Sequence, residues 1–259
     1  DSDNQTDGLW FPEHRALQDG HLLSLRGAQS IPMLNPEAPK LGHRHTLAFI
    51  LLLDCELNWF LGNFPQIDKD TEELVPFCEK NGFIYIGAHG YFYRGERAVL
   101  EGKVKEGIAQ MRQSLAIMEG TGTLTCFSRL RARVAEACRK VGALEEGLSA
   151  VDWALEAVQK YDERYMEAEL YRLKGELLRM RGEPENEVEK YFRQAIELSR
   201  LRSAKSWELR AVMSLSRLRQ RQGKREEARK ILEEVYSWFT EGFATPDLIE
   251  AKALLEELS

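Results

Sequence analysis

The chain has 259 residues, of which 43% are apolar and 30% are charged, and its 36 basic and 42 acidic side chains give a net charge of −6. This composition can build a sizeable core, so it excludes a disordered or collagen-like chain, and its acidic balance gives no general attraction to nucleic acid or anionic membranes. The longest apolar stretch, Leu47 to Leu53, is far shorter than the roughly 20 apolar residues that a membrane span needs.

The first 44 residues are expected to be partly irregular. They contain Gly, Pro and Asn residues that interrupt regular structure, as in the stretch from Ile31 to Pro39. One short helix is predicted around His14 to Arg26. Two readings stay open for residues 1–44: the remnant of an earlier repeat, or a segment that covers the N-terminal face of the repeats that follow.

The compartment is expected to be the cytoplasm. Four cysteines without a C-x-x-C pair are too few for a disulfide scaffold, which favours a reducing environment. The first residues are polar and lack the apolar core of a signal peptide. Because the chain begins with Asp1 and not with Met, a fragment of a longer protein is one reading.

An internal repeat of about 40 residues organises residues 45–244. Five glycines mark it, with gaps of 40, 40, 40 and 41 residues: Gly62, Gly102, Gly142, Gly182 and Gly223. Each lies between two helix-like stretches, and glycine ends a helix readily because it adopts the left-handed conformation without a Cβ clash. We therefore predict five hairpins, each consisting of a helix, a tight turn and a second helix.

Two columns of small side chains support this register. Seven residues before the glycines stand Cys55, Gly95, Ala135, Gly175 and Ser216. The second helices carry mostly small residues at Gly107, Gly147, Val188 and Ala228. Small side chains let helices approach closely, so the two helices of each hairpin are expected to pack along these columns.

Local propensity conflicts with the repeat between Phe83 and Tyr93. This stretch is aromatic, β-branched and glycine-rich, which by itself favours a β-hairpin. Gly95 and Gly102 are nevertheless in register with the other units, so we predict a helix.

A last helix is predicted within residues 245–259. Thr245 suits the N-cap and Pro246 suits the first helical position, where its missing N–H costs nothing. The helix should run to about Leu258 and place Leu248, Ala251, Leu255 and Leu258 on one face. Such a helix would cap the open end of the repeats.

The spaced small residues on helix pairs resemble the tetratricopeptide repeat, in a 40-residue form instead of the usual unit of about 34 residues, over roughly residues 45–244. No regular proline closes each unit, and the column of the family's tryptophan holds Leu51, Tyr91, Arg131, Tyr171 and Val212. The resemblance implies an all-α, right-handed solenoid of helix hairpins with a C-terminal capping helix.

The C-terminal half is similar to a recurrent tail of bacterial signalling proteins. The similarity lies in the stretches Ala168 to Leu178, Ala204 to Arg210 and Tyr236 to Asp247. In such proteins the tail follows an ATPase module of the signal-transduction type, often with a nucleotide cyclase or DNA-binding domain upstream. The resemblance implies a regulatory part of a signalling ATPase, with the parent's own ATPase or cyclase domain as one candidate partner.

Signatures of catalysis are not found in the sequence. Neither Gly102-Lys103 nor Gly223-Lys224 completes a Walker loop, and no G-x-S-x-G or H-E-x-x-H motif is present. His43 and His45 lack a third metal ligand at useful spacing. We therefore expect no enzyme activity, no cofactor and no metal site.

The candidate binding residues lie on the first helices, which line a concave groove when helix hairpins stack. The column after each small residue should face this groove, and it reads Glu56, Glu96, Glu136, Glu176 and Arg217. Other candidates, aromatic near the N-terminal end and cationic in the last three hairpins, are Trp59, His89, Phe92, Arg129, Arg139, Arg172, Arg179 and Arg210.

Two functional hypotheses follow from these residues. The first is a non-catalytic regulatory module that docks a protein or peptide in the groove, since Arg and aromatic side chains dominate recognition energetics. The alternative is a small-ligand sensor that uses the aromatic part of the groove.

A purely structural reading stands beside both hypotheses. In it the aromatics are core, and Arg172 with Glu176 is an ordinary i, i+4 pair. Nucleic acid is disfavoured as a partner, because 25 acidic and 25 basic residues cancel from residue 123 onward.

Overall fold

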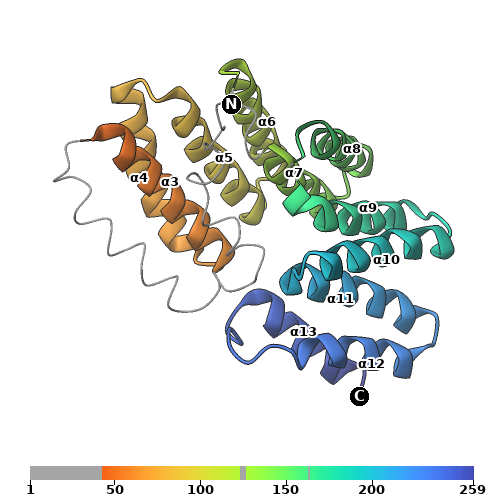
Figure 1. Ribbon diagram of the computed structural model, residues 1–259. Helices are drawn as coiled ribbons and strands as arrows, with labels where there is room; N and C mark the ends of the chain where they lie inside the picture. The colour runs from red at the N-terminus through yellow and green to blue at the C-terminus, as the bar shows by residue number, and fades with distance from the viewer. Residues whose placement is uncertain (1–42, 123–126, 163) are drawn as a thin grey trace, which may run out of the picture.

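The computed structural model describes residues 43–122, 127–162 and 164–259. Within these ranges the chain forms eleven α-helices, one short 3-10 helix and no strand. Consecutive helices pair into five hairpins, and a single helix follows them (Figure 1). This arrangement confirms the predicted all-α solenoid. The N-terminal segment lies almost entirely outside the described residues.

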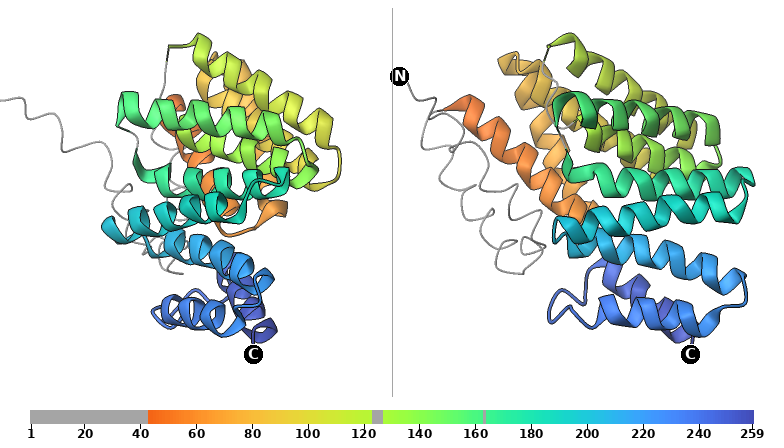
Figure 2. Two further views of the ribbon diagram at one scale, coloured as in Figure 1. Left: turned by 90° about the vertical axis from the view of Figure 1, so that its right-hand side faces the viewer. Right: turned by 45° about the vertical axis from the view of Figure 1, so that its right-hand side comes forward.

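The hairpins follow one another in chain order (Figure 2). They are α3 (Arg44–Phe60) with α4 (Phe64–Asn81), α5 (Ile84–Leu100) with α6 (Val104–Gly120), α7 (Phe127–Val141) with α8 (Leu144–Tyr161), α9 (Glu167–Arg181) with α10 (Glu185–Leu201), and α11 (Lys205–Arg221) with α12 (Arg225–Tyr236). The 3-10 helix η3 (Arg164–Met166) precedes α9, and α13 (Pro246–Glu257) closes the chain.

Left-handed residues end nine of the ten hairpin helices, all except α12. The turns within the hairpins use the five predicted glycines, whose φ values run from 68° to 90°. The turns after α4, α6, α8 and α10 repeat in the same way, with positive φ at Gly82, Gly122, Asp162 and Ser203, whereas α12 ends at Tyr236 without such a residue. Glycine spacing does not reveal this second series, because Asp162 and Ser203 stand at two of its positions.

The small-residue columns bring the two helices of a hairpin into backbone contact. A Cβ added at Gly107 would overlap the carbonyl oxygen of Gly95 and lie 2.8 Å from the backbone nitrogen of Val99. In the fifth hairpin the same two columns meet through a hydrogen bond, since Ser216 Oγ donates to the carbonyl of Ala228 at 3.0 Å. The predicted packing of first on second helices is therefore observed in both hairpins.

The segment with strand propensity is helical, as the repeat predicts. It forms the first half of α5, where Phe92 and Tyr93 have no exposed surface. Tertiary packing thus outweighs local β propensity, which is a weak term beside the burial of two large aromatic side chains.

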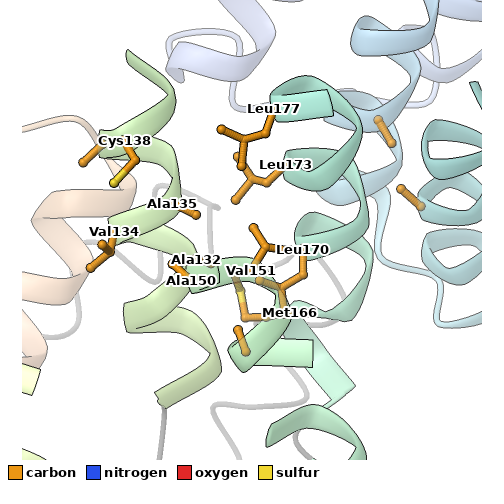
Figure 3. Close-up of a cluster of buried hydrophobic side chains, with 14 of the residues drawn as sticks. Ala132, Val134, Ala135, Cys138, Ala150, Val151, Met166, Leu170, Leu173 and Leu177 are labelled. Atoms are coloured by element: carbon orange, nitrogen blue, oxygen red, sulfur yellow. The ribbon is translucent and has the colours of Figure 1, made fainter. Parts of the chain in front are cut away.

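Apolar side chains form a core between the stacked hairpins. Figure 3 shows Leu170, Leu173 and Leu177 of α9 pointing toward α7 and α8. On α7 they face the small residues Ala135 and Cys138, so large and small side chains interlock. One cluster of this kind runs from α5 to α13, and a separate one joins α3, α4 and α5.

The capping helix α13 closes the end of the solenoid. Leu248, Ala251, Leu254 and Leu258 are buried against the fifth hairpin. The prediction placed Leu255 on this face, but Leu255 is only partly buried and Leu254 takes the central position. Thr245 is the N-cap residue with extended backbone, although its side chain makes no capping hydrogen bond.

The first helices lie on the inner side of the solenoid. Neighbouring first helices pack on each other at α3–α5, α7–α9 and α9–α11, whereas neighbouring second helices are not among the packed pairs of the described chain. The first helices therefore line the concave face. No helix in the described part of the chain is both long and apolar enough to cross a membrane.

The backbone contact at Gly107 predicts an asymmetry between two Gly→Ala changes in α6. Gly107→Ala should destabilise the protein by about 1–3 kcal/mol, because its Cβ meets backbone that cannot move aside. Gly120→Ala should be neutral or stabilising by up to about 1 kcal/mol, because a Cβ there meets no atom and helical glycine is entropically unfavourable. Urea unfolding of both variants measures the difference, and equal effects would contradict the close approach.

Candidate functional site

Each residue of the predicted groove column is ion-paired. Arg129 and Arg133 of α7 bind Glu56 of α3 and Glu96 of α5, so α7 reaches across the concave face to the first two hairpins. Arg139 and Arg179 donate to the glutamates three positions before them on their own helices, Glu136 and Glu176. The glutamate ladder predicted from spacing is therefore a ladder of glutamate–arginine pairs.

The fifth position of the column is also ion-paired, but the column residue is basic and its partner is acidic. Arg217 takes the place of a glutamate, and its Nη2 lies 2.7 Å from a carboxylate oxygen of Glu250 on α13. The capping helix thus completes the column with the complementary charge. Arg225 holds the C-terminal end of α13, because it donates hydrogen bonds to carbonyl oxygens of the last residues, including Leu258 at 3.1 Å.

Ion pairs of α7, α9, α11 and α13 join into one assembly, which we call the concave network. Arg172 donates to Glu169 through Nε and Nη2 at 2.7 and 2.8 Å, and lies 4.0 Å from Glu136. Arg210 of α11 binds Glu169 at 3.0 Å and Asp247 of α13 at 3.6 Å. Ser214 of α11 connects the pair of Glu176 and Arg179 to these groups, because its Oγ accepts from Nη1 of Arg172 at 3.4 Å and it also hydrogen-bonds Glu176. The charged members of the network are Glu136, Arg139, Glu169, Arg172, Glu176, Arg179, Arg210 and Asp247.

The concave network holds four acidic and four basic groups, and burial makes their pairing strong. Burial alone would raise the pKa of Glu136, but hydrogen bonds from Arg139 and the charges of Arg172 and Arg210 lower it to about 2. Burial would also lower the pKa of Arg172, yet Glu169, Glu136 and Glu176 raise it. Both groups therefore stay charged at neutral pH.

A second cluster, which we call the Arg133 box, occupies the N-terminal part of the concave face. The guanidinium carbon of Arg133 lies 4.4 Å from the ring centroid of Trp59, 4.5 Å from Tyr93 and 5.1 Å from Phe92. Its Nε donates to Glu96 at 3.0 Å, and its side chain is only 4% exposed. The aromatic part of the groove is therefore filled from within by Arg133.

His89 lies buried beside this box. It stands in the same column as Arg129, Glu169 and Arg210, and it is 2% exposed. Neither ring nitrogen has a hydrogen-bond partner among the described residues, and its ring meets Tyr85 edge-on with centroids 4.9 Å apart. Burial, and then the charge of Arg133, lower the pKa of His89 to about 3, so the imidazole is neutral at pH 7.

The predicted site residues fall into two groups of different accessibility. Arg139, Arg179 and Arg210 keep 27%, 24% and 22% of their side-chain surface exposed. Phe92 and His89 are buried, so the molecule as it stands offers a partner neither side chain. Arg172 and Glu176 also differ from the expected i, i+4 pair, because each binds a partner three residues away instead.

Spacing did not identify Arg133, Glu169, Ser214 or Asp247 as site residues. The sequence does carry a signal for Arg133. The equivalent positions of the other repeats hold the uncharged residues Leu53, Tyr93, Leu173 and Ser214, and an arginine at such a position needs a buried partner. There is a signal for Glu169 too, since it lies seven residues before Glu176 and hence on the same face. There is none for Asp247, because its role depends on where α13 folds back.

No three His, Cys, Asp or Glu side chains of the described part of the chain come together as a metal would require. Two surface hollows, of about 680 and 310 Å³, lie around α8, away from the concave network. On α9 the larger one is lined by Lys174, Leu178 and Arg181, each two positions beyond a network residue and so on the opposite helix face.

Comparisons with known proteins support the fold. No family model matches the sequence, and no curated protein matches it. Among solved structures, Rap protein complexed with Competence and Sporulation Factor is similar, with a TM-score of 0.69 and 15% identity. The match covers 95% of this chain and 71% of that chain. At this identity the likeness shows the fold, and it gives no link to signalling ATPases.

The buried ion pairs of the concave network predict a large cost for Glu136→Gln. The variant leaves two arginines without their shared carboxylate, so the free energy of unfolding should fall by about 1–3 kcal/mol. Glu145→Gln is the matched control, since Glu145 is 80% exposed and its pair with Arg181 should contribute less than about 1 kcal/mol. Similar losses in the two variants, measured by urea unfolding, would contradict the assignment.

The neutral, buried His89 predicts a loss of stability in mild acid. Unfolded histidine binds a proton below about pH 6.5, whereas folded His89 does so only near pH 3, so the unfolded state takes up more protons within this window. Protonation of this histidine in the unfolded state should lower the free energy of unfolding by about 2 kcal/mol between pH 7 and pH 5. His89→Leu should lose that part of the pH dependence, with the same change at exposed His45 as the control. A His89→Leu protein with the wild-type slope would overturn this prediction.

Proposed function

We propose that the protein is a non-catalytic, regulatory binding module that docks a segment of another protein, or a peptide, on the concave network. The observation that carries the proposal is the concentration of charge there. Four acidic and four basic side chains from α7, α9, α11 and α13 share one inner face, and most of them are buried or half-buried.

Stability alone gives a poor reason for such a network. Buried ion pairs cost desolvation, and apolar residues of similar volume are often as stabilising or more so. A set of fixed charges on an inner face is useful when it selects a partner, because a wrong partner would leave those charges unpaired.

The partly exposed arginines indicate which chemical groups the partner presents. A guanidinium has five N–H donors, and a bidentate carboxylate takes two of them. Arg139 binds Glu136 in this way through Nε and Nη2, and Arg179 binds Glu176 through the same two nitrogens, so each retains further donors. Acceptors fit these donors, which favours peptide carbonyls and acidic side chains as the partner's groups.

Similarity to other proteins supports the binding and regulatory parts of the proposal. Rap protein, whose fold is similar, was solved complexed with Competence and Sporulation Factor, so binding a partner suits this architecture. The similarity of the C-terminal half to bacterial signalling tails leads us to propose a regulatory role in the cytoplasm, within or beside a signalling ATPase. The small-ligand alternative has less support, because Arg133 fills the aromatic cluster it would use.

Site-specific photo-crosslinking in cells that make the protein tests the proposal. Gln220 lies in the column of Arg139 and Arg179 and takes part in no network pair, so a benzoylphenylalanine there probes the concave face without disturbing it. The control position is Glu197, which is exposed on α10. We expect a protein or peptide adduct at position 220, identified by mass spectrometry, and none at position 197.

The adduct should depend on the exposed arginines. Combining the label with Arg139→Gln and Arg179→Gln should weaken capture by about tenfold or more, because each charge-assisted hydrogen bond contributes roughly 1.5–3 kcal/mol. Because these substitutions also break network pairs, the comparison is made under conditions in which circular dichroism shows both labelled proteins fully folded. Equal capture at both positions, or capture that ignores the arginines, would count against docking on the concave network.

A further inference from the structure

The first hairpin is joined to the solenoid differently from the others. Side chains of α3 and α4 share an apolar cluster with α5 that is separate from the cluster running from α5 to α13. At the next step, α5 and α7 are not among the packed pairs of neighbouring first helices, and α6 packs on α7 less extensively than α8 packs on α9. Apolar packing therefore connects the first hairpin to the third only indirectly.

Arg133 stands where the two clusters meet. Phe92 belongs to the larger cluster and Tyr93 to the smaller one, and the guanidinium of Arg133 lies against both rings. Trp59 of α3 covers it as well, with its ring centroid 4.4 Å from the guanidinium carbon. A side chain of the third hairpin is thus seated in aromatic groups of the first and second hairpins.

Arg129 adds a second connection from the same helix face. It lies one turn before Arg133 on α7 and forms an ion pair with Glu56 of α3, with 8% and 18% of the two side chains exposed. Arg133 binds Glu96 of α5 in parallel. Two buried guanidinium groups therefore span from α7 to α3, past the intervening first helix.

We propose that Arg129 and Arg133 form a latch that fixes the α3–α4 hairpin against α7, and that releasing the latch lowers the free energy needed to open this hairpin locally. Buried guanidinium groups are costly without their carboxylates and aromatic neighbours, so partial withdrawal is unfavourable and the latch is either closed or open. Because Glu56 and Trp59 lie on the concave face, the latch fixes the shape of its N-terminal end.

Amide hydrogen exchange of the full chain, followed by mass spectrometry, tests the latch. Arg133→Ala should raise exchange in residues 44–81 by about tenfold or more and leave residues 167–221 unchanged, since cation–π and charge-assisted contacts to the first hairpins are lost. The matched control is Arg131→Ala on the same helix. Arg131 also lies over a tryptophan, Trp153, at 3.8 Å and pairs with Glu119, but these two partners belong to α8 and α6 and not to the first hairpin. This control should leave residues 44–81 protected.

A charge swap keeps the test decisive if Arg133→Ala does not fold. Arg129→Glu should raise exchange in residues 44–81 because two carboxylates then face each other, and Glu56→Arg with Arg129→Glu should restore protection. A rise of equal size in all helices, equal effects of Arg131→Ala and Arg133→Ala, no rise at all, or a double variant no better protected than Arg129→Glu would each overturn the latch.

Discussion

The close approach of the two helices of a hairpin, seen in the second and fifth hairpins, is the constraint on which the rest of the structure depends. Gly95 and Gly107 bring α5 and α6 into backbone contact, and the side chain of Ser216 on α11 hydrogen-bonds the backbone carbonyl of Ala228 on α12. A hairpin packed this tightly cannot bury its apolar faces alone, so it stacks on its neighbours. Stacking crowds the first helices on the inner side, and the long charged side chains of adjacent hairpins then meet one another.

That crowding explains why the charges of the inner face occur in pairs. A carboxylate withdrawn from water is stable only with a compensating cation and hydrogen bonds. Four positions of the column carry glutamate and each finds an arginine, while the fifth carries Arg217 and finds Glu250. The reversal at the last position shows that what recurs along this face is the pairing and not the sign of the charge.

The sequence was sufficient for the architecture because its determinants are local. Glycines at fixed spacing place the turns, and the same spacing correctly overruled the strand propensity of the segment that begins α5. It also placed the glutamate column and most of its arginines on one face. The second series of turns could not be predicted from glycine spacing, because Asp162 and Ser203 adopt the left-handed conformation in place of glycine.

The partners of the site residues could not be predicted in the same way. Arg133 reaches Trp59, and Arg210 reaches Asp247, only because the hairpins curve around a shared inner face. Spacing gives the face on which a residue lies, but it does not give the distance between faces of different hairpins. Ion pairs between hairpins depend on that distance, whereas pairs within one helix, such as Glu136 with Arg139, depend only on the helix itself.

The two ends of the concave face use the same chemistry with opposite consequences. At the N-terminal end, Arg133 is enclosed by three aromatic rings and a carboxylate, and its 4% exposure leaves nothing for a partner. Toward the C-terminal end, Arg139, Arg179 and Arg210 are bound on one side and about a quarter exposed on the other. An arginine held in place by a carboxylate loses little conformational entropy when it binds a further acceptor. Intramolecular pairing therefore closes the first end and prepares the second, which is why the docking proposal rests on the last three hairpins.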